Sequence, residues 1–216
     1  MGSIRCTVED KVSKIIKLLK KCYPQVDTAL VFNTPFELLV AAILSAQCTD
    51  KQVNKITADL FKKYNQPQDF AQLTQDELEK EIKSCGLYRN KSRFIIGSAR
   101  EIMKQHGGHV PMTRSELEAL PGVGRKTAGV IIGVAYGGSA LPVDTHVFRL
   151  AHRLGLSTER EPAKVEKDLI ACVPPDERMP FHHRLIFHGR EICLARKPAC
   201  HRCCLKDYCS LYQSGK

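Results

Sequence analysis

Apolar side chains recur along this chain of 216 residues at intervals of three and four positions, which is the spacing of one helix face. Such stripes occupy the segments 12–19, 53–61, 92–104 and 163–172. The alternating pattern of half-buried strands is almost absent. The pattern therefore predicts an all-α protein of about ten short helices.

The expected helix boundaries carry their own signals. Four threonines each stand three residues before a Glu or Gln, the spacing of a capping box. These pairs are Thr34 with Glu37, Thr49 with Gln52, Thr74 with Glu77, and Thr113 with Glu116. Gly86 and the glycine pair at 107–108 are predicted to end helices at their C-termini.

A glycine-rich turn, LPGVGRKTAG at 120–129, interrupts the helical pattern directly before a lysine. It is not a nucleotide-binding P-loop, because Arg125 stands where that motif requires glycine, immediately before Lys126. It is not a dinucleotide fingerprint either, because Thr127 replaces the third glycine and no strand precedes it. We interpret residues 113–136 as a helix, a hairpin and a second helix.

The hairpin predicts a phosphate contact. Gly122 and Gly124 leave backbone N–H groups uncovered, and these groups can hold one phosphate of a nucleic acid at the positive end of the next helix. A plain corner between two helices is the alternative, but the neighbouring Arg125 and Lys126 favour the phosphate.

Lys126 is also a candidate nucleophile, because a neutral lysine amine can form a Schiff base at a sugar C1′ carbon. The adjacent Arg125 and the helix N-terminus both disfavour the protonated amine. Asp144 is the candidate partner, since an ionised carboxylate can stabilise an oxocarbenium-like sugar. Each has an ordinary alternative: the lysine as a phosphate contact, and the aspartate as a helix N-cap with Val143 and Phe148 as a hydrophobic staple.

Charge points to the same kind of partner. Thirty-three Lys and Arg residues against twenty-three Asp and Glu give a net charge of +10, which attracts nucleic acid or an acidic membrane surface. The longest apolar run, 128–143, is interrupted by glycines and a proline and is too short to span a membrane. The N-terminus lacks the apolar core of a signal peptide. We expect a monomer in the bacterial cytoplasm, associated with the nucleoid and without a membrane partner.

Half of the ten cysteines lie between residues 193 and 209. The spacing Cys193-x6-Cys200-x2-Cys203-x5-Cys209 supplies four thiolates, which suits either zinc or a [4Fe–4S] cluster. Cys204 falls outside this spacing, although it could replace Cys203 as a ligand. The loop after the first cysteine carries Arg196 and Lys197, which a metal centre could present to a phosphate backbone.

Three motifs in combination resemble the endonuclease III family, DNA glycosylases that also have AP lyase activity. They are LPGVGRKTA at 120–128, VDTHVFRL at 143–150 and the cysteine-rich tail, and LSAQCTD at 44–50 and GLYRNK at 86–91 add to them. The resemblance runs from about residue 30 to the C-terminus. It implies a six-helix domain at 28–138 with the helix–hairpin–helix at about 113–136. Residues 1–27 and 139–216 would form a second helical domain with a [4Fe–4S] cluster, and DNA would bind in a cleft between the two.

The resemblance also implies roles for residues. Lys126 would attack C1′, displace the damaged base and form a Schiff base, and β-elimination would then cut the strand on the 3′ side. Asp144 would assist this attack. Gln47 and Leu87 would fill the gap left in the duplex by the flipped nucleotide, and His146 would line the cleft, unless it serves only the helix N-terminus. The implied substrates are double-stranded DNA with oxidised pyrimidines, such as thymine glycol, or with abasic sites.

Two features depart from the family pattern. Gly129 stands where many members carry Asn, and Cys204 doubles the third cysteine of the tail. Two other functions remain open. One is a monofunctional mismatch glycosylase of the same fold, which usually lacks the lysine. The other is a non-enzymatic iron–sulfur module that binds DNA, which does not explain why Lys126 and Asp144 occur together.

Overall fold

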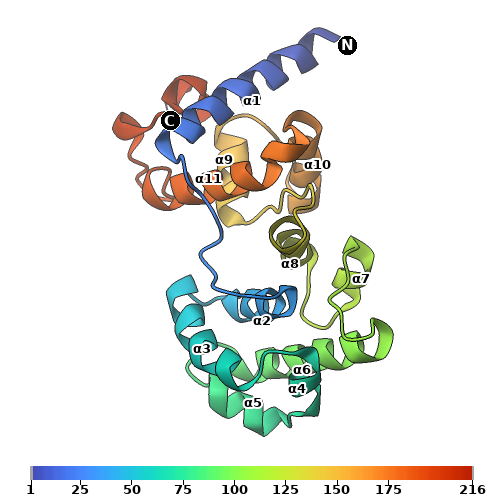
Figure 1. The fold of residues 1–216 in the computed structure, drawn as a ribbon. Coiled ribbons are helices and arrows are strands. Elements are labelled where there is room, and N and C mark those ends of the chain that lie inside the picture. The colour runs from blue at the N-terminus through green and yellow to red at the C-terminus, as the bar shows by residue number, and fades with distance from the viewer. Residues whose placement is uncertain (1, 216) are drawn as a thin grey trace. The chain divides into compact units, whose positions relative to one another are not determined.

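The computed structural model of the protein describes residues 2–215, with the side chains of residues 8–215. Helices and turns account for its regular structure, and no strand occurs in this part of the chain, so the prediction of an all-α fold is confirmed (Figure 1). The α-helices are α1 (Gly2–Cys22), α2 (Pro35–Ser45), α3 (Asp50–Lys63), α4 (Pro67–Gln72), α5 (Gln75–Ile82), α6 (Tyr88–Gln105), α7 (Arg114–Ala119), α8 (Arg125–Val130), α9 (Thr145–Arg153), α10 (Pro162–Cys172), α11 (Arg178–Glu191) and α12 (Ser210–Gln213). A π-helix, η1 (Ile131–Ala135), follows α8, and the 3₁₀ turns are η2 (Pro175–Glu177), η3 (Cys200–Arg202) and η4 (Lys206–Tyr208). None of the described helices is long and apolar enough to cross a membrane.

The chain divides into two compact units, each with its own apolar core. Unit 1 is Met1–Asp27 together with Ser139–Lys216, and it contains α1 and α9 to α12. Unit 2 is Thr28–Gly138, and it contains α2 to α8 and η1. Segments at the two ends of the sequence therefore share one core.

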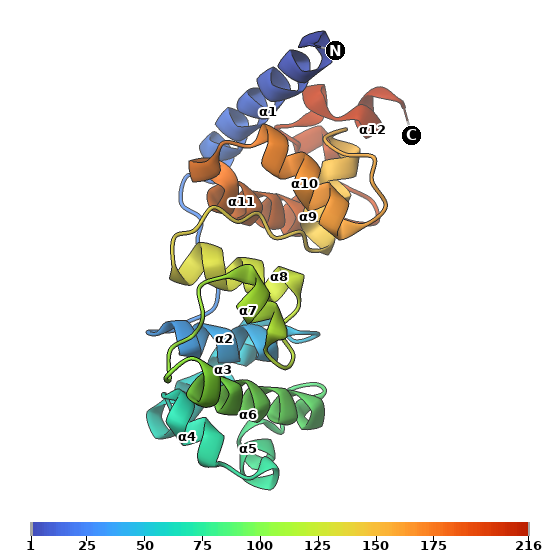
Figure 2. The ribbon, with the colours of Figure 1, turned by 90° about the vertical axis from the view of Figure 1, so that its right-hand side faces the viewer.

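Unit 2 is built around α2 and α6. Every residue of α2 from Phe36 to Leu44 is buried, which explains why this helix is apolar on all sides rather than on one face. The long helix α6 packs against α4, α5 and α2 (Figure 2). Its buried positions, among them Ile95, Ala99 and Ile102, form the stripe that the sequence pattern predicts.

Unit 1 is built around α9 and α11, which lie side by side. Gly189 on α11 makes this close approach possible, because a Cβ atom there would lie 2.9 Å from Nδ1 of His146. Helix α1 covers α10 and α11 with the predicted face, and Val12, Ile15 and Leu19 on it are completely buried.

All four predicted threonine caps begin a helix. The hydroxyl of each accepts a hydrogen bond from the backbone N–H three residues later, as it does at Thr34, Thr49, Thr74 and Thr113. The Glu and Gln side chains three residues after these threonines do not all bond back to the cap as a capping box requires. Glu77 closes its box on Thr74, but Glu37 accepts from the N–H of Asn33, and Gln52 donates to Ser84.

The prediction that Gly86 ends a helix is wrong. Helix α5 ends earlier, at Ile82, and the left-handed residue in this turn is Leu87, with φ 60°. The physical reason is the burial of Cys85, which is 2% exposed and donates its thiol to the carbonyl of Leu44 at 3.4 Å. Helix α6 then begins at Tyr88, ahead of the predicted start at 92.

A cavity in the core of unit 2 should be costly. Leu39 is completely buried, so we expect Leu39→Ala to lower the free energy of unfolding by about 2–5 kcal/mol. Val31 is 65% exposed, and Val31→Ala should change it by less than about 0.5 kcal/mol. Urea unfolding followed by circular dichroism measures both. Equal effects would contradict the assignment of Leu39 to the core.

Candidate functional site

The hairpin between α7 and α8 has a fixed shape. Leu120 and Val123 point into the core of unit 2, and the N–H of Val123 donates to the carbonyl of Leu120 at 3.1 Å. Gly122 between them has φ +76°, a conformation that favours glycine. Gly124 is the N-cap of α8 in an extended conformation. Both glycines are exposed, so their backbone is accessible to a ligand.

Helix α6 provides the surface on which the hairpin rests. The hydroxyl of Ser98 donates to the carbonyl of Pro121 at 2.7 Å. Gly97 lets Pro121 approach, because a Cβ atom there would lie 3.2 Å from the proline ring. The side chain of Phe94 lies so close to Gly122 that a Cβ atom on Gly122 would be 2.6 Å from Cβ of Phe94 and 2.7 Å from its ring. The hairpin is therefore held by packing as well as by its own hydrogen bonds.

Lys126 lies in the first turn of α8 and is exposed. Its ammonium group makes no hydrogen bond or ion pair with any described residue, so its amine is available to a bound molecule. Gly129, the first departure from the family pattern, is buried in α8, and the chain beyond it stays helical as η1 to Ala135. Single π-helical turns of this kind are frequent at functional sites.

Asp144 caps α9 in unit 1. Its Oδ1 accepts hydrogen bonds from the N–H groups of His146 at 2.9 Å and Val147 at 2.8 Å. No described residue donates to Oδ2. Val143 and Phe148 belong to the same apolar cluster, as a hydrophobic staple requires. The capping role therefore uses one carboxylate oxygen and leaves the other for a ligand.

His146 is half-buried at the start of α9. Burial lowers the pKa of this imidazole, and the guanidinium groups of Arg149 and Arg190 act in the same direction against the opposing charge of Asp144. Nη2 of Arg149 lies 3.1 Å from Nδ1 of His146. Because a guanidinium only donates, Nδ1 accepts, and the neutral ring carries its proton on Nε2.

Two exposed loops of unit 2 come together at Gln47 and Leu87. Both residues are exposed, and both adopt positive φ, at 54° and 60°. Such angles are uncommon outside glycine and cost of the order of 1–3 kcal/mol, so they persist only where the surroundings impose them. Gly86 lies against the first loop, since a Cβ atom on it would be 3.6 Å from the carbonyl oxygen of Gln47.

The four cysteines of the predicted spacing line one cavity. Cys193, Cys200, Cys203 and Cys209 surround a space of about 60 Å³ in unit 1, and Cys204 is not among its lining residues. The thiol of Cys204 instead contacts Cys22 on α1, and burial raises its pKa to about 12. This placement favours Cys203 over Cys204 as the third ligand.

Arginines of α9 hold the loop that follows the first cysteine. Arg153 donates to the sulfur of Cys193 at 3.2 Å and to the carbonyls of Leu194 at 2.7 Å and Ala195 at 2.9 Å. Nε of Arg149 donates to the carbonyl of Cys193 at 3.1 Å. No motif in the sequence points to these arginines, although their spacing of four residues places both on one face of α9. The loop presents Arg196 and Lys197, both exposed, and Lys197 has φ 51°.

A buried histidine completes the surroundings of the cysteines. His188 on α11 is 2% exposed, and burial lowers its pKa to about 4, so the ring is neutral at pH 7. Its Nε2 lies 3.3 Å from the sulfur of Cys203, and its Nδ1 lies 3.2 Å from the hydroxyl of Tyr23. The neutral ring can donate from Nε2 to a thiolate while Nδ1 accepts from the phenol. Hydrogen bonds of this kind orient metal ligands.

The donor set fits an iron–sulfur cluster. In the described part of the chain, no group of three or more His, Cys, Asp or Glu side chains is arranged around a single metal ion. The four thiols line one cavity, and four Cys thiolates are the ligands that a [4Fe–4S] cluster takes. The guanidinium of Arg153 beside Cys193 offsets the negative charge that four thiolates bring.

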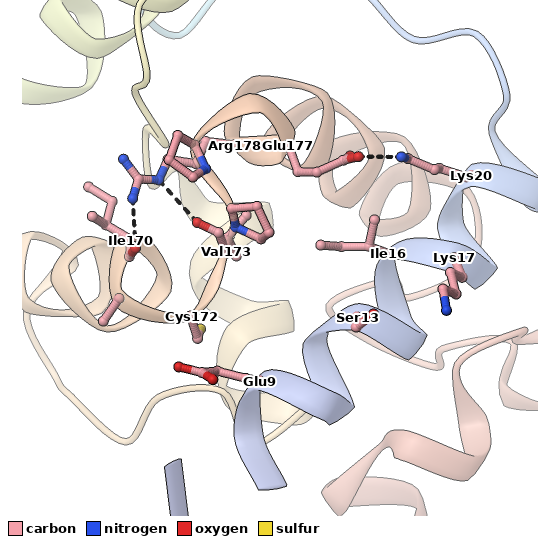
Figure 3. A pocket seen from close by; sticks show the side chains of 13 residues that line it. Glu9, Ser13, Ile16, Lys17, Lys20, Ile170, Cys172, Val173, Glu177 and Arg178 are labelled. Carbon is pink, nitrogen blue, oxygen red and sulfur yellow. Dashed lines mark hydrogen bonds and ion pairs between the residues drawn. The ribbon is translucent and has the colours of Figure 1, made fainter. Parts of the chain in front are cut away.

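A second pocket in unit 1, of about 490 Å³, contains none of the predicted site residues (Figure 3). It lies between α1 and the segment around η2, and Cys172 and Glu9 point toward it (Figure 3). Lys20 pairs with Glu177 at its edge, and Arg178 donates to the carbonyls of Val173 and Ile170. We assign no ligand to it.

Comparison with known proteins gives consistent matches. Residues 40–175 match the HhH-GPD superfamily of base excision DNA repair proteins, and residues 193–209 match the iron–sulfur binding domain of endonuclease III. Endonuclease III of Haemophilus influenzae is 45% identical over 196 residues, 91% of this chain and 93% of that protein. Endonuclease III of Bacillus subtilis is 47% identical over 188 residues, 87% of this chain and 86% of that protein.

Solved structures agree with these sequence matches. A trapped covalent intermediate of endonuclease III with DNA superimposes with a TM-score of 0.91 at 43% identity, covering 96% of this chain and 98% of that one. A thermostable thymine-DNA glycosylase superimposes with a TM-score of 0.86 at 27% identity, covering 95% of this chain and 98% of that one. The second match shows that this fold also occurs in a protein named as a thymine-DNA glycosylase.

The two hairpin glycines should respond differently to substitution. Gly122→Ala introduces a Cβ atom at positive φ and against Phe94, so we expect a loss of about 1–3 kcal/mol in the free energy of unfolding. Gly124→Ala meets no atom within 4 Å and has an ordinary φ of −94°, so it should cost less than about 1 kcal/mol. Urea unfolding measures both changes. Equal losses would show that the hairpin does not have the described shape.

The neighbouring cysteines provide a matched pair for the cluster. We expect Cys203→Ser to lose most of the bound iron and acid-labile sulfide, because Cys203 lines the cavity. Cys204→Ser should retain both, because Cys204 lies outside it. Iron and sulfide per protein chain are measured on both purified variants. Retention by the first variant and loss by the second would reverse the assignment, and zinc without sulfide would exclude a cluster.

Proposed function

The chain belongs to the endonuclease III family of the HhH-GPD superfamily, and from this membership we infer that it is a DNA glycosylase and AP lyase of base excision repair. It binds DNA and contains an iron–sulfur domain in its C-terminal segment. We further propose that its substrates are oxidised pyrimidines in double-stranded DNA, together with abasic sites. The exposed amine of Lys126 beside the hairpin, which none of the described residues engages, is the observation that carries the mechanism.

Lys126 acts as the nucleophile in this proposal. Its nitrogen lone pair attacks C1′ of the damaged nucleotide, the glycosidic bond breaks, and the base leaves with the bonding electrons and is protonated by water. Opening of the sugar ring gives a Schiff base between Nζ and C1′. Loss of a C2′ proton then expels the 3′ phosphate by β-elimination, and hydrolysis returns the amine. A lysine already engaged in an ion pair would be less suited to this step.

Asp144 supports the same chemistry through its second oxygen. The two N–H groups that bind Oδ1 fix the orientation of the carboxylate. An ionised Oδ2 can stabilise the positive charge that develops on the sugar as the base leaves. His146, with Nδ1 engaged by Arg149, presents only its Nε2 side to a bound strand.

The remaining predicted residues hold the DNA. The backbone at Gly122 and Gly124, with Arg125, binds a phosphate near the damaged nucleotide, and Arg196 and Lys197 bind a second stretch of the backbone. A base must leave the stack before its glycosidic bond is accessible. Gln47 and Leu87 fill the space it leaves, and their exposure and forced backbone angles support this role.

The iron–sulfur cluster supports DNA binding rather than the chemical step. Cys193, Cys200, Cys203 and Cys209 hold it, and a [4Fe–4S] cluster when bound supplies a rigid crosslink between these four positions. Arg149 and Arg153 fix the intervening loop from α9. The loop thus keeps Arg196 and Lys197 in place. We also propose that the protein acts as a monomer on the chromosome in the bacterial cytoplasm.

A monofunctional glycosylase remains the alternative, because a thymine-DNA glycosylase shares the fold at 27% identity. The alternative predicts release of a mismatched thymine without a covalent intermediate. Lys126 favours the bifunctional reaction.

Borohydride trapping tests the role of Lys126. Duplex DNA with one thymine glycol or one abasic site should form a covalent adduct with the wild-type protein and none with Lys126→Ala. Asp144→Asn keeps an N-cap, so it should fold, trap abasic DNA and release thymine glycol roughly 10²–10³ times more slowly. Base release without an adduct from the wild type would contradict the Schiff base. No base release and no adduct, from protein with its cluster, would contradict enzyme activity.

A further inference from the structure

Lys91 is a buried cation without a role so far. It lies in the first turn of α6 and is 3% exposed. Its Nζ donates to the carbonyl of Leu44 at 2.9 Å and to the sulfur of Cys85 at 3.2 Å. Lysine is almost never fully buried, because an ammonium group is costly to remove from water unless it is hydrogen-bonded. A buried lysine at this position therefore requires an explanation beyond packing.

The electrostatics of the two neighbouring helices indicate what Lys91 does. A cation in the first turn of a helix faces the positive end of the helix dipole, so Lys91 is unfavourable for α6 itself. Its ammonium reaches instead to the last turn of α2, which ends at Ser45 and whose carbonyls, at the negative end of the helix, lack the helical i+4 partner. The interaction stabilises the junction of two helices rather than either helix alone.

The junction lies directly beneath the two loops with positive φ. The chain leaving α2 at Ser45, the residue after Leu44, reaches Gln47, and the chain entering α6 passes through Cys85 and Leu87. The thiol of Cys85 donates to the same carbonyl of Leu44, at 3.4 Å, so three groups meet at one point. The side chain of Lys91 is buried there and cannot contact DNA.

We propose that Lys91 is a positioning residue that fixes the spacing of Gln47 and Leu87, so that both enter the gap in the duplex together. This inference rests on the proposed function, in which these two residues replace the flipped nucleotide. Removing the ammonium leaves the carbonyl of Leu44 and the thiol of Cys85 without their shared donor. The two loops can then separate, although neither exposed residue has been altered.

The test measures gap filling separately from catalysis. The probe is a duplex with an uncleavable abasic analogue and 2-aminopurine opposite it, whose fluorescence rises when the base is unstacked. Fluorescence is recorded at saturating protein, and single-turnover cleavage is recorded on a duplex with a true abasic site. The variants are Lys91→Met, Lys91→Arg, Leu87→Ala and Lys104→Met, all in the cluster-containing protein. Lys104 is the matched control, since it is an exposed lysine on the same helix.

We expect Lys91→Met to lose most of the fluorescence rise, as Leu87→Ala does, and to cleave about 10- to 100-fold more slowly. Lys91→Arg should recover part of both signals, and Lys104→Met should match the wild type. The double variant of Lys91→Met and Leu87→Ala should be little slower than either single variant, because both act on one event.

A full fluorescence rise with Lys91→Met overturns the proposal, even if the variant is less stable, because a purely structural role changes stability without changing the gap. If Lys91→Met does not fold, Lys91→Gln replaces it, since its side chain remains polar but is one bond too short to reach the carbonyl of Leu44. That variant must then show the reduced rise, and a full rise overturns the proposal. Cleavage of abasic DNA without a fluorescence rise from the wild type also overturns it. If the wild type shows neither cleavage nor a fluorescence rise, the proposed function itself is contradicted.

Discussion

The site residues of unit 2 depend on hydrogen bonds from one helix to the backbone of other segments. Three side chains of α6 donate hydrogen bonds to backbone carbonyls: Lys91 to Leu44, Ser98 to Pro121 and Arg100 to Ala71. A carbonyl at a helix end or in a turn has no partner within its own segment, so each of these bonds removes a cost while it fixes a loop. The hairpin and the two exposed loops are thereby held in place by the same helix, α6.

Unit 1 uses the same device around its cysteines. Arg149 of α9 binds the carbonyl of Cys193, and Arg153 binds those of Leu194 and Ala195 in the loop that follows. These bonds hold the loop by protein groups as well as by the thiols at its ends. The arrangement explains how a tail with little regular structure can present two basic side chains in a defined place.

The helix caps could be predicted from the sequence because they depend on neighbouring residues. The contacts between segments that are distant in sequence could not. The threonine caps and the cap at Asp144 involve neighbours within three residues, so the sequence pattern sufficed. Gly86 shows the limit: a glycine after a helix is usually its end, but burial of Cys85 ended α5 earlier and moved the left-handed angle to Leu87. Lys91 shows it as well, because its partner Leu44 is distant in sequence. Its position four residues before Ile95, on the buried face, was the available signal.

The use of cations inside the fold has a consequence for how the protein responds to salt. Binding to DNA releases one set of condensed counterions for each phosphate that a basic side chain neutralises, so the salt dependence of affinity reports those contacts and not the formal charge. Lys91 is buried, and Arg149 and Arg153 are committed to carbonyls of their own chain. Some of the basic side chains behind the net charge of +10 therefore hold the fold together and do not contact DNA phosphates. Affinity for DNA should therefore weaken less steeply with ionic strength than a count of basic residues would suggest.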